Sequence, residues 1–507
     1  MKKIILKTIK ELNNWKANSK EDINFVPTMG NLHNGHAELI SSAKKFIPNK
    51  TLVSIFINPL QFDNEKDLIT YPKTQNKDIQ LAFSCGAEAI FIPSRQEIFP
   101  ENNVIYKKAS KKLSSKLCGL KRIGHFDGVC TVVYRLLDIV KPKTIFLGEK
   151  DWQQLIILKN MIKEMKLNIE VKSISNQRDI DMVPYSSRNN LLTKTEREKL
   201  RIFSYELLNA KKNFNKDNII NMKNIIRNLE DKNIKVEYLN HLSAYDLKES
   251  IKQENITILA GAILCGDKRL IDNVFLMKRN PIVAIDGPAG SGKSTISKLI
   301  AKKLNFIYLD TGAMYRALSW FLINEKINYS DSDKLDKCLK AISIIFKSNL
   351  NESQDVFINN FCVTEKIRSQ KISSLVSSIA SINIVRKFLV NEQQKIGAEG
   401  GIVAEGRDIG TTVFPKAEIK IFLTASIEER SKRRKLELEN KGHGKIKFNE
   451  IKNQIEKRDF DDSNRKISPL RKAKDALELF TDGLTIDQIV NEIIDIYYEK
   501  IPKELQK

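Results

Sequence analysis

Eight residues in the second half of the chain have the order of a phosphate-binding loop, Gly-Pro-Ala-Gly-Ser-Gly-Lys-Ser. An apolar run at 282–285 comes before the loop and a helix-like stretch at 295–304 follows it, which is the context that such a loop requires. Its backbone N–H groups can close around phosphate oxygens, Lys293 can reach the outer phosphates, and Ser294 is placed to ligate Mg²⁺. The loop therefore predicts binding of ATP and Mg²⁺, with Lys293 as a catalytic residue. The residues concerned are Gly287, Pro288, Ala289, Gly290, Ser291, Gly292, Lys293 and Ser294.

A second phosphate-binding corner is predicted near the start of the chain. His33 and His36 flank Gly35 directly after the first strand-like run, where a helix-like stretch begins. The glycine lets the backbone approach a ligand, and both imidazoles can donate N–H groups to phosphate oxygens at a helix N-terminus. These two and His125 are three of only five histidines, and each stands close to a glycine, so ordinary surface or core roles explain them poorly. The corner suits the triphosphate of ATP.

Length and composition indicate more than one globular domain. A chain of 507 residues is too long for one ordinary core, and the phosphate-binding loop comes too late to organise the first half. The net charge of +23, from 85 basic and 62 acidic residues, would suit nucleic acid, a membrane surface or anionic substrates. The lysines are dispersed and form no long basic block. We therefore favour solvated basic faces and small anionic substrates, with neither nucleic acid nor a membrane as partner.

The cysteines and the first residues indicate a cytoplasmic protein. Six cysteines stand far apart without a Cys-x-x-Cys pair, which gives neither zinc-ligand spacing nor a disulfide framework. The start of the chain resembles a signal peptide only briefly, because Lys7 and Lys10 interrupt its apolar region. No segment approaches the ~20 apolar residues needed to span a bilayer. We expect a soluble, cytoplasmic protein with reduced thiols.

The elements that must position these residues alternate between strand and helix in the first half. Apolar strand-like runs occur at 25–26, 52–57, 89–92 and 144–147, with helix-length amphipathic stretches between them. This alternation predicts an α/β fold with a parallel sheet covered on both faces. Residues from 189 to about 252 are charged and helix-like, and an apolar run at 256–264 and a strand-like run at 269–277 follow. We interpret this part as a smaller α+β subdomain.

The second half predicts another α/β domain after a short linker that ends at Pro281. Strand-like runs at 342–346 and 355–363 predict a small inserted sheet, and 427–441 predicts a helix with repeated arginines. We place the domains at residues 1–278, divided into about 1–178 and 179–278, and at 281–507.

The histidine corner resembles the nucleotidyltransferase superfamily, which includes class I aminoacyl-tRNA synthetases and several adenylyltransferases. Four further segments, 56–62, 124–129, 148–154 and 186–189, stand in the order found in bacterial pantothenate synthetase. The resemblance covers roughly residues 1–278. It implies a Rossmann-like fold and ATP-dependent condensation of (R)-pantoate with β-alanine through pantoyl-adenylate, which gives pantothenate, AMP and diphosphate. Such synthetases are usually dimers, so we expect a homodimer through this half.

The resemblance assigns a role to each of these segments. His33, His36, Lys150 and Arg188 are expected to be catalytic, with His36 either as proton donor or only as a hydrogen-bond donor. An isolated glutamine is usually solvent-exposed, and only the motifs identify Gln61 and Gln154 as the amides that orient pantoate, with Gln61 also near β-alanine. The expected ATP-binding residues are Met29, Gly30, Asn31, Leu32, His33, Asn34, Gly35, His36, Gly148, Glu149, Lys150, Asp151, Gln177, Tyr185, Ser186, Ser187 and Arg188.

Two positions depart from the pattern of this family. The family usually has glycine at the position of Met182, so the backbone of that loop is expected to differ. Gln177 stands where the family more often has a valine that contacts the nucleotide. Both differences concern the adenine edge of the predicted ATP pocket.

In the second half, three segments after the phosphate-binding loop resemble bacterial cytidylate kinase. They lie in order at 310–316, 405–410 and 458–465, and the resemblance covers roughly residues 281–507. It implies a P-loop nucleoside-monophosphate kinase domain with a parallel sheet, and ATP-dependent phosphorylation of CMP or dCMP to the diphosphate. Arginines suit this chemistry, because two phosphate groups must be brought together against their repulsion.

The resemblance also assigns the CMP site residue by residue. The acceptor phosphate is assigned to Arg316, Arg407 and Arg465, the cytosine edge to Ser377, Arg386 and Asp408, and the ribose to Arg458 and Asp462, with Thr311 in the same site. The helix that carries Arg430, Arg433 and Arg434 is expected to be a lid over ATP. Thr481-Asp482-Gly483 replaces the family's usual Asp-Thr-Ser type of sequence.

Other functions are compatible with parts of the sequence. A class I tRNA synthetase would explain the histidine corner and the positive charge, but neither a Lys-Met-Ser-Lys-Ser-like loop nor an anticodon-binding domain is visible. Phosphopantetheine adenylyltransferase shares the corner but not the contexts of Gln61 and Gln154. The kinase half could instead be a dephospho-CoA kinase, or the chain a nucleic-acid-binding protein with a vestigial ATPase half. The arginine motifs at 407–408 and 458–465 favour a nucleotide acceptor.

Overall fold

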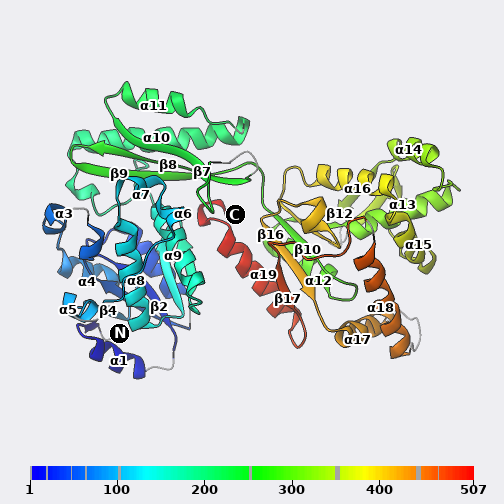
Figure 1. Cartoon of the computed structure of the whole chain (residues 1–507), viewed down its shortest axis with the longest axis horizontal. Helices are drawn as coiled ribbons and strands as arrows, with labels where there is room; N and C mark the ends of the chain where they lie inside the picture. The colour runs from blue at the N-terminus through cyan, green and yellow to red at the C-terminus, as the bar shows by residue number, and fades with distance from the viewer. Residues whose placement is uncertain are drawn as a thin grey trace. The chain divides into compact units, whose positions relative to one another are not determined.

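The computed structural model describes residues 3–18, 21–46, 48–62, 65–100, 104–217, 219–249, 254–348, 354–440, 447–465 and 467–506. The chain forms two compact units (Figure 1): Met1–Lys278 together with Ile501–Lys507, and Arg279–Lys500. The predicted second domain extended to residue 507, and the structure corrects this, because the chain from Ile501 onward belongs to the first unit. Among the described residues, no helix combines the length and the apolar character that crossing a membrane requires.

The first unit is built on a parallel six-stranded sheet with the order β1-β4-β3-β2-β5-β6. Its strands are β1 (Ile4–Leu6), β2 (Ile23–Thr28), β3 (Lys50–Ile55), β4 (Ala89–Phe91), β5 (Thr144–Gly148) and β6 (Glu170–Ile174). From β2 the chain builds through β3 and β4 toward one edge, and it then returns to place β5 on the other side of β2. The direction of strand addition reverses between β2 and β5, which is where open α/β sheets bind ligands.

Helices cover both faces of this sheet. Accordingly, successive residues of the central strand β2 are apolar and buried on both sides. Phe25 and Val26 point to opposite faces of β2, and both are fully buried. Val26 packs with Ile40 of α2 and Ile90 of β4 in one core cluster. The longer helices are α1 (Ile9–Ala17), α2 (Asn34–Lys45), α4 (Gln75–Ser84), α8 (His125–Val140) and α9 (Trp152–Glu164), and the shorter ones are α3 (Glu65–Ile69), α5 (Arg95–Ile98), α6 (Lys111–Ser114) and α7 (Leu117–Lys121).

An antiparallel sheet with two helices completes the first unit. Helices α10 (Lys194–Asp217) and α11 (Met222–Glu230) lie along the sheet β7-β8-β9 in Figure 1. The strands are β7 (Lys235–Ser243), β8 (Ile256–Cys265) and β9 (Lys268–Met277). The α+β subdomain is confirmed, but the prediction of helical structure up to about residue 252 is wrong for β7. One of its charged residues, Glu237, meets Arg269 of β9 at 2.6 Å, across the intervening strand β8.

The second unit is a parallel five-stranded sheet with the order β11-β15-β10-β16-β17. Its strands are β10 (Ile282–Asp286), β11 (Ile307–Asp310), β15 (Ile402–Gly406), β16 (Ile419–Thr424) and β17 (Leu477–Phe480). Its helices are α12 (Lys293–Leu304), α13 (Thr311–Asn324), α14 (Ser332–Lys340), α15 (Gln370–Ala380), α16 (Asn383–Ile396), α17 (Ile427–Asn440), α18 (Phe448–Asn464) and α19 (Ile486–Lys500). The predicted α/β fold of both halves is confirmed.

The predicted inserted sheet is present in the second unit. It is antiparallel, with β12 (Ile344–Ser348), β13 (Gln354–Ile358) and β14 (Phe361–Cys362). Most of the polar stretch expected between its first two strands, 349–353, lies outside the described residues. Apolar residues of this sheet, such as Ile344 and Val356, join the core that Leu309 and Met314 form beside the parallel sheet.

The loop around Met182 keeps a backbone conformation that favours glycine. Met182 has φ of 66°, and its side chain is about half exposed (48%). Its N–H donates to Asp179 O at 2.9 Å, and its carbonyl accepts from Arg178 Nη1 at 3.0 Å. These bonds hold the turn, and the methionine carries the strain of a positive φ that glycine would adopt freely.

We predict that Met182→Gly raises the free energy of unfolding of the first unit by about 0.5–1 kcal/mol, because glycine adopts positive φ without strain and little buried surface is lost. Met182→Ala is the matched control, since it shortens the side chain but keeps the Cβ and the strain. Chemical denaturation would compare the three proteins. Equal stability of the glycine and alanine variants would contradict the prediction.

Candidate active sites

A cavity of about 360 Å³ opens in the first unit where the loops after β2 and β5 meet. Most of the residues assigned to the ATP and pantoate sites line it. They are Met29, Gly30, His33, Gly35, His36, Gln61, Gly148, Lys150, Asp151, Gln154, Gln177, Tyr185, Ser186, Ser187 and Arg188. The remaining four, Asn31, Leu32, Asn34 and Glu149, are not among its lining residues. The structure therefore gathers segments that lie far apart in the sequence into one hollow.

Backbone hydrogen bonds fix the orientation of both histidine rings. His33 is the N-cap of α2, and its Nδ1 accepts from the N–H of Gly35 at 3.1 Å. His36 Nδ1 accepts from the N–H of His33 at 3.3 Å. Because each Nδ1 is an acceptor, the proton of each neutral imidazole is on Nε2. A side chain at Gly35 would come within 3.0 Å of the His33 ring, which explains the glycine between them.

Both imidazoles are held in the neutral form. Burial, followed by the neighbouring His36 and Lys150, lowers the pKa of His33 to about 2. Burial lowers the pKa of His36 to about 4, with Asp151 opposing and Lys150 adding to the effect. The two rings lie 4.1 Å apart between centroids. The corner thus presents two neutral N–H donors beside one lysine, which suits a phosphate anion.

A buried carboxylate that the sequence did not indicate supports this corner from behind. Asp78 of α4 is 3% exposed and accepts the N–H groups of Asn31 at 3.0 Å and Leu32 at 2.8 Å. Asn31 also donates through Nδ2 to Ser187 O at 2.7 Å, and Ser187 Oγ donates back to Asn31 O at 3.2 Å. Leu32 therefore acts through its backbone, whereas Asn31 uses both its backbone and its side chain and ties the histidine corner to the Ser186–Arg188 segment.

Gln61 is positioned by three residues outside the predicted set. Asn58 Nδ2 donates to Gln61 Oε1 at 3.1 Å, which leaves the amide Nε2 toward Met29 Sδ at 2.7 Å. The carbonyl of Gln61 accepts from His125 Nδ1 at 2.7 Å and from Arg122 Nη2 at 3.0 Å. The sequence analysis grouped His125 with His33 and His36 because a glycine stands close to each. In the structure His125 is buried and holds the backbone of Gln61.

The two adjacent glutamines of α9 have different roles. Gln153 is buried and uses its whole amide on the protein, donating to Leu113 O and Lys116 O and accepting from the N–H of Cys118. Both glutamines line the cavity, but only the Gln153 amide is fully bonded to the protein, so Gln154 stays the predicted ligand of pantoate.

The loop that carries Lys150 is clamped from the subdomain sheet. Asn273 Nδ2 of β9 donates to the carbonyls of Glu149 at 3.3 Å and of Lys150 at 2.7 Å. Lys150 Nζ lies 3.6 Å from Asp151 Oδ1, and its charge acts on the pKa of both His33 and His36. Asn273 is another supporting residue without a sequence signal.

The loop after β6 closes the cavity over the histidines. The N–H of Tyr185 donates to Gln177 O at 3.0 Å, and the Tyr185 ring stacks on His33 with centroids 6.2 Å apart. Asn34 Nδ2 donates to the Tyr185 hydroxyl at 3.1 Å. The Gln177 amide donates to Ser175 O and Oγ, so this substitution for valine is accommodated within its own loop.

In the second unit, the phosphate-binding loop joins β10 to α12. Gly287, Gly290 and Gly292 have φ of 153°, 75° and 87°, which other residues rarely adopt. A Cβ at Gly287 would lie 2.0 Å from Leu423 O, so the loop and β16 could not pack with any other residue there. Lys293 Nζ donates to Pro288 O at 2.6 Å and lies 3.4 Å from Ser291 Oγ. Burial and then Arg407 hold the pKa of Lys293 well below its usual range.

A buried glutamate stands behind this loop. Glu405, the residue of β15 that pairs with Ile285, is 5% exposed. Its Oε2 accepts from Ser294 Oγ at 2.9 Å, and its Oε1 accepts from the Tyr308 hydroxyl. Burial and then Asp310 raise the pKa of Glu405. Its motif was recognised in the sequence, but this residue was not assigned.

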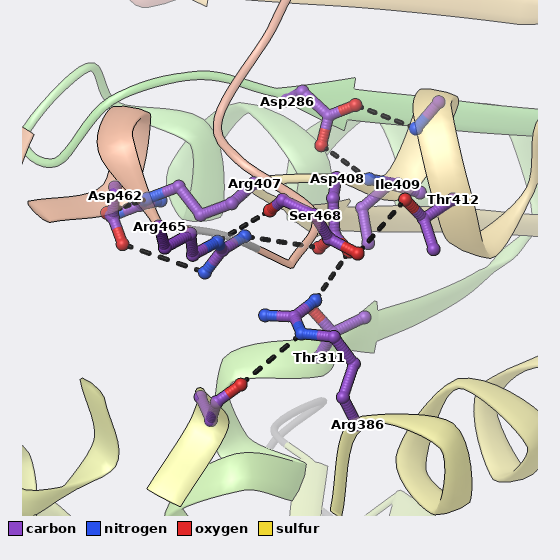
Figure 2. Close-up of polar contacts among 12 residues, drawn as sticks. Asp286, Thr311, Arg386, Arg407, Asp408, Ile409, Thr412, Asp462, Arg465 and Ser468 are labelled. Carbon is purple, nitrogen blue, oxygen red and sulfur yellow. Dashed lines mark hydrogen bonds and ion pairs between the residues drawn. The ribbon is translucent and has the colours of Figure 1, made fainter. Parts of the chain in front are cut away.

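Several of the arginines assigned to CMP gather around two aspartates (Figure 2). Arg407 Nε donates to Asp462 Oδ2 at 2.8 Å, and Arg465 lies 3.7 Å from Asp462 and 3.8 Å from Asp408. Burial, then the neighbouring Arg407, lowers the pKa of Arg458 to about 10. Positive charge therefore exceeds negative charge here, and an anion would relieve the repulsion.

The buried pair Arg386–Asp408 forms the base of this site. Arg386 Nη1 donates to Asp408 Oδ2 at 2.6 Å, and the guanidinium lies over the Tyr315 ring. Asp286, at the end of β10, accepts the N–H groups of Ile409 and Gly410, both at 2.7 Å, as Figure 2 shows. Burial raises the pKa of Asp286 to about 6. Asp286 thus fixes the backbone that follows Asp408.

The other predicted CMP residues differ in their surroundings. Thr311 donates through Oγ1 to Glu405 O at 2.7 Å, which is a structural contact. Arg316 pairs with Asp310 at 3.0 Å, and Ser377 is exposed on α15.

Comparison with known proteins identifies the family of each half. Residues 4–275 match the family described as pantoate-beta-alanine ligase, and residues 283–499 match cytidylate kinase. A bifunctional pantoate ligase/cytidylate kinase of Prochlorococcus marinus strain MIT 9312 is 62% identical over 508 residues, which cover 100% of both chains. Its counterpart from strain NATL1A is 48% identical over 99% of this chain and 98% of its own. The chain belongs to the bifunctional pantoate ligase/cytidylate kinase family.

A solved structure supports the fold of the ligase half. Pantothenate synthetase from Thermus thermophilus has 31% sequence identity and a TM-score of 0.50, and the match covers 54% of this chain and 98% of that one. The chain therefore has pantoate–β-alanine ligase and cytidylate kinase activities. The dephospho-CoA kinase and nucleic-acid-binding alternatives are not supported, because the second half matches cytidylate kinase along nearly its whole length.

The arginine-bearing helix of the kinase half, α17, is anchored at two of its three predicted arginines. Arg430 is buried and donates to Ala289 O of the phosphate-binding loop at 3.1 Å and to Asp459 of α18 at 2.5 Å. Arg433 donates to the hydroxyl and the carbonyl of Thr481 at 2.9 and 3.0 Å. The departure at Thr481-Asp482 thus supplies an acceptor for this helix, and Asp482 accepts the N–H of Ser426 at 3.0 Å.

We predict that the His33 and His36 imidazoles stay neutral, as Nε2–H tautomers, from pH 8 down to pH 5 in the free protein. Their pKa values of about 2 and 4 lie below this window, whereas an ordinary histidine titrates inside it. Imidazole ¹⁵N–¹H spectra would report this directly, and His33→Gln and His36→Gln would assign the two signals among five histidines. An inflection near pH 6.5 in either signal would contradict it.

Proposed function

We propose that the ligase half uses ATP to activate pantoate in the cavity between the β2 and β5 loops. The observation that carries this proposal is the pair of neutral Nε2–H imidazoles beside Lys150, in a cavity that Arg188 also lines. In the first step the pantoate carboxylate attacks the α-phosphorus of ATP, and the bond to diphosphate breaks. In the second step the β-alanine amine attacks the acyl carbon of pantoyl-adenylate, and AMP leaves.

The donors of this site act on the charge that develops on diphosphate. His33, His36, Lys150 and Arg188 are positioned before substrate arrives, so little reorganisation is needed as the charge builds. His36 serves as a neutral hydrogen-bond donor rather than as a proton donor, since its low pKa leaves it without an extra proton at neutral pH. Ser186 and Ser187 add hydroxyl groups on the same side of the cavity.

Two amides orient pantoate for the attack. Gln61 and Gln154 come from different elements, η1 (Pro59–Gln61) and α9, and both line the cavity. An amide can donate to a carboxylate and accept from a hydroxyl without adding charge next to the nucleophile. The expected homodimer through this half rests on the resemblance and stays a prediction.

We propose that the kinase half transfers the γ-phosphoryl group of ATP to the phosphate of CMP or dCMP. The observation that carries this proposal is the group of arginines around Asp408 and Asp462, of which Arg386 is buried and Arg407 and Arg465 are half-buried. Arg407 and Arg465 would hold the acceptor phosphate, and Arg458 with Asp462 the ribose. The paired Arg386 and Asp408 offer donors and acceptors for the edge of cytosine.

The residues of the kinase site suit Mg²⁺, which needs only a few protein ligands. Within the described residues, no cluster of three or more His, Cys, Asp or Glu is arranged to hold a metal ion by itself. Mg²⁺ usually takes one or two protein oxygens together with waters and substrate phosphates. The Ser294 hydroxyl and the buried Glu405 carboxylate, 2.9 Å apart, supply such hard oxygens beside Lys293. Bound there, Mg²⁺ would neutralise charge on the outer phosphates of ATP.

We predict that Lys293→Met lowers phosphoryl transfer to CMP by about 10²- to 10³-fold and leaves pantothenate formation within about twofold of the unmodified protein. His36→Ala should show the opposite pattern, because it removes one phosphate donor of the ligase site only. Both activities would be measured on each purified variant, with thermal unfolding as the check of fold. Loss of both activities in either folded variant would contradict the assignment of two independent sites.

We predict that Glu405→Gln raises the Mg²⁺ concentration for half-maximal kinase velocity by about 10- to 100-fold, because the carboxylate that orients Ser294 becomes a neutral amide. Kinase velocity would be titrated with Mg²⁺ at fixed ATP, and ligase activity at saturating Mg²⁺ serves as the control of fold. An unchanged Mg²⁺ requirement would show that Glu405 does not act on the metal.

A further inference from the structure

Glu149 is a fully buried carboxylate in the loop between β5 and α9, next to Lys150. Its Oε1 accepts from Ser173 Oγ at 2.8 Å and from the N–H of Lys503 at 2.5 Å. Its Oε2 accepts from the N–H of Glu504 at 3.3 Å. Two of these three donors are thus backbone groups that follow the last helix of the kinase unit, although they belong to the first compact unit.

The chain end that supplies these donors is itself fixed in the first unit. Ile501 and Pro502 are buried, and η6 (Lys503–Leu505) packs against β9. Gln506 Nε2 donates to Ile501 O at 2.7 Å, and Glu504 pairs with Lys211 of α10. The segment is therefore a packed part of this unit and meets Glu149 in a defined position.

The position of Glu149 determines that of Lys150. The Glu149 carboxylate is held by the chain end and by β6, while the carbonyls of Glu149 and Lys150 are held by Asn273. With its side chain and its backbone both fixed, this loop can place Lys150 only where its charge reaches His33 and His36. The loop would move if the carboxylate lost its donors, since a buried charge needs hydrogen-bond partners.

We propose that the C-terminal segment Ile501–Gln506 is a positioning element of the ligase site, which acts through Glu149 on Lys150. The kinase unit is thereby inserted between two parts of the ligase unit, and ligase activity depends on residues beyond the kinase. The proposal rests on the proposed role of Lys150 in nucleotide binding. It adds that the backbone N–H groups of residues 503 and 504 are needed for that role.

Lys503→Pro removes the N–H that bonds Glu149, together with a side chain whose Nζ donates to Gln506 Oε1 at 3.0 Å. The Lys503 side chain is exposed, and Pro502 has φ of −51° and ψ of 137°, which suits a following proline at the first position of a short helix. Lys503→Ala is the matched control, since it removes the side chain and keeps the N–H. We expect ligase kcat/KM to fall about 10- to 100-fold in the proline variant and to stay within about twofold in the alanine variant. Kinase activity should be unchanged in both.

The pH profile separates positioning from general destabilisation. Burial raises the pKa of Glu149, whereas the hydrogen bonds from Lys503, Ser173 and Glu504 lower it. The carboxylate of Glu504 on η6, which pairs with Lys211, adds to the rise. Loss of one N–H bond should raise this pKa further, so the ionised form is lost as pH falls. Ligase activity of Lys503→Pro should therefore decline from pH 8 to pH 6 relative to the alanine variant. In the double variant with Glu149→Gln this added pH dependence should vanish.

The outcomes are distinct. Ligase activity of Lys503→Pro within twofold of Lys503→Ala would overturn the proposal, as would an added pH dependence that persists in the double variant. Lys150→Ala tests the underlying assignment separately. If Lys150→Ala leaves ligase activity unchanged, the role of Lys150 is wrong, whereas a proline effect on pH dependence would still show that the chain end acts on Glu149.

Discussion

In both sites the side chains expected to bind anions lie where burial lowers their pKa and so disfavours their positively charged form. In the ligase half this constraint keeps His33 and His36 neutral, so they offer N–H dipoles without the cost of a buried cation. In the kinase half Lys293 and Arg458 have lowered pKa values for the same reason. The hydrogen-bond donors and positive charges of each site are therefore suited to a phosphate group. Phosphoryl and adenylyl transfer require such preorganised donors. Negative charge shifts in the transition state, and donors that are already in place stabilise it without rearranging.

A buried carboxylate lies behind each of these loops and holds it in place. Asp78 binds two N–H groups before His33, and Glu149 is bound next to Lys150. Asp286 binds the N–H groups that follow Asp408, and Glu405 binds the hydroxyl of Ser294. Asp78, Glu149 and Asp286 bind backbone N–H groups, and Asp286 and Glu405 also place negative charge within reach of Lys293. The same arrangement in two unrelated sheets follows from one requirement, which is to keep positive groups rigid in a dry place.

The sequence predicted the loops that meet phosphate better than the residues that support them. The glycines at positive φ, such as Gly290 and Gly292, can be recognised in the sequence, because other residues adopt that backbone only rarely. Asp78 and Asn273 cannot be recognised in this way, since an acidic residue in a helix and an asparagine in a strand are ordinary until the fold brings them to a distant loop. His125 was grouped with the ATP site because glycines surround it, but its contact with Gln61 O depends on packing between two helical segments. The strand β7 was missed because it follows a charged helical stretch and itself begins with the charged residues Lys235 and Glu237, as an exposed helix would.

The domain boundary at the end of the chain was wrong for a related physical reason. Residues 501–506 contact Glu149 mainly through backbone N–H groups, which every residue except proline has, so no side-chain pattern could reveal the contact. The chain leaves the first unit at Lys278 and returns to it at Ile501, which makes the kinase an insertion in the ligase fold rather than an appended domain. An inserted domain is constrained at both ends, because the residues before it and the segment after it both pack in the first unit. The two activities need not share a substrate or a channel to be coupled. A ligase loop whose buried carboxylate is completed by residues beyond the kinase gives the fusion a structural link, because the first unit includes segments from both sides of the kinase.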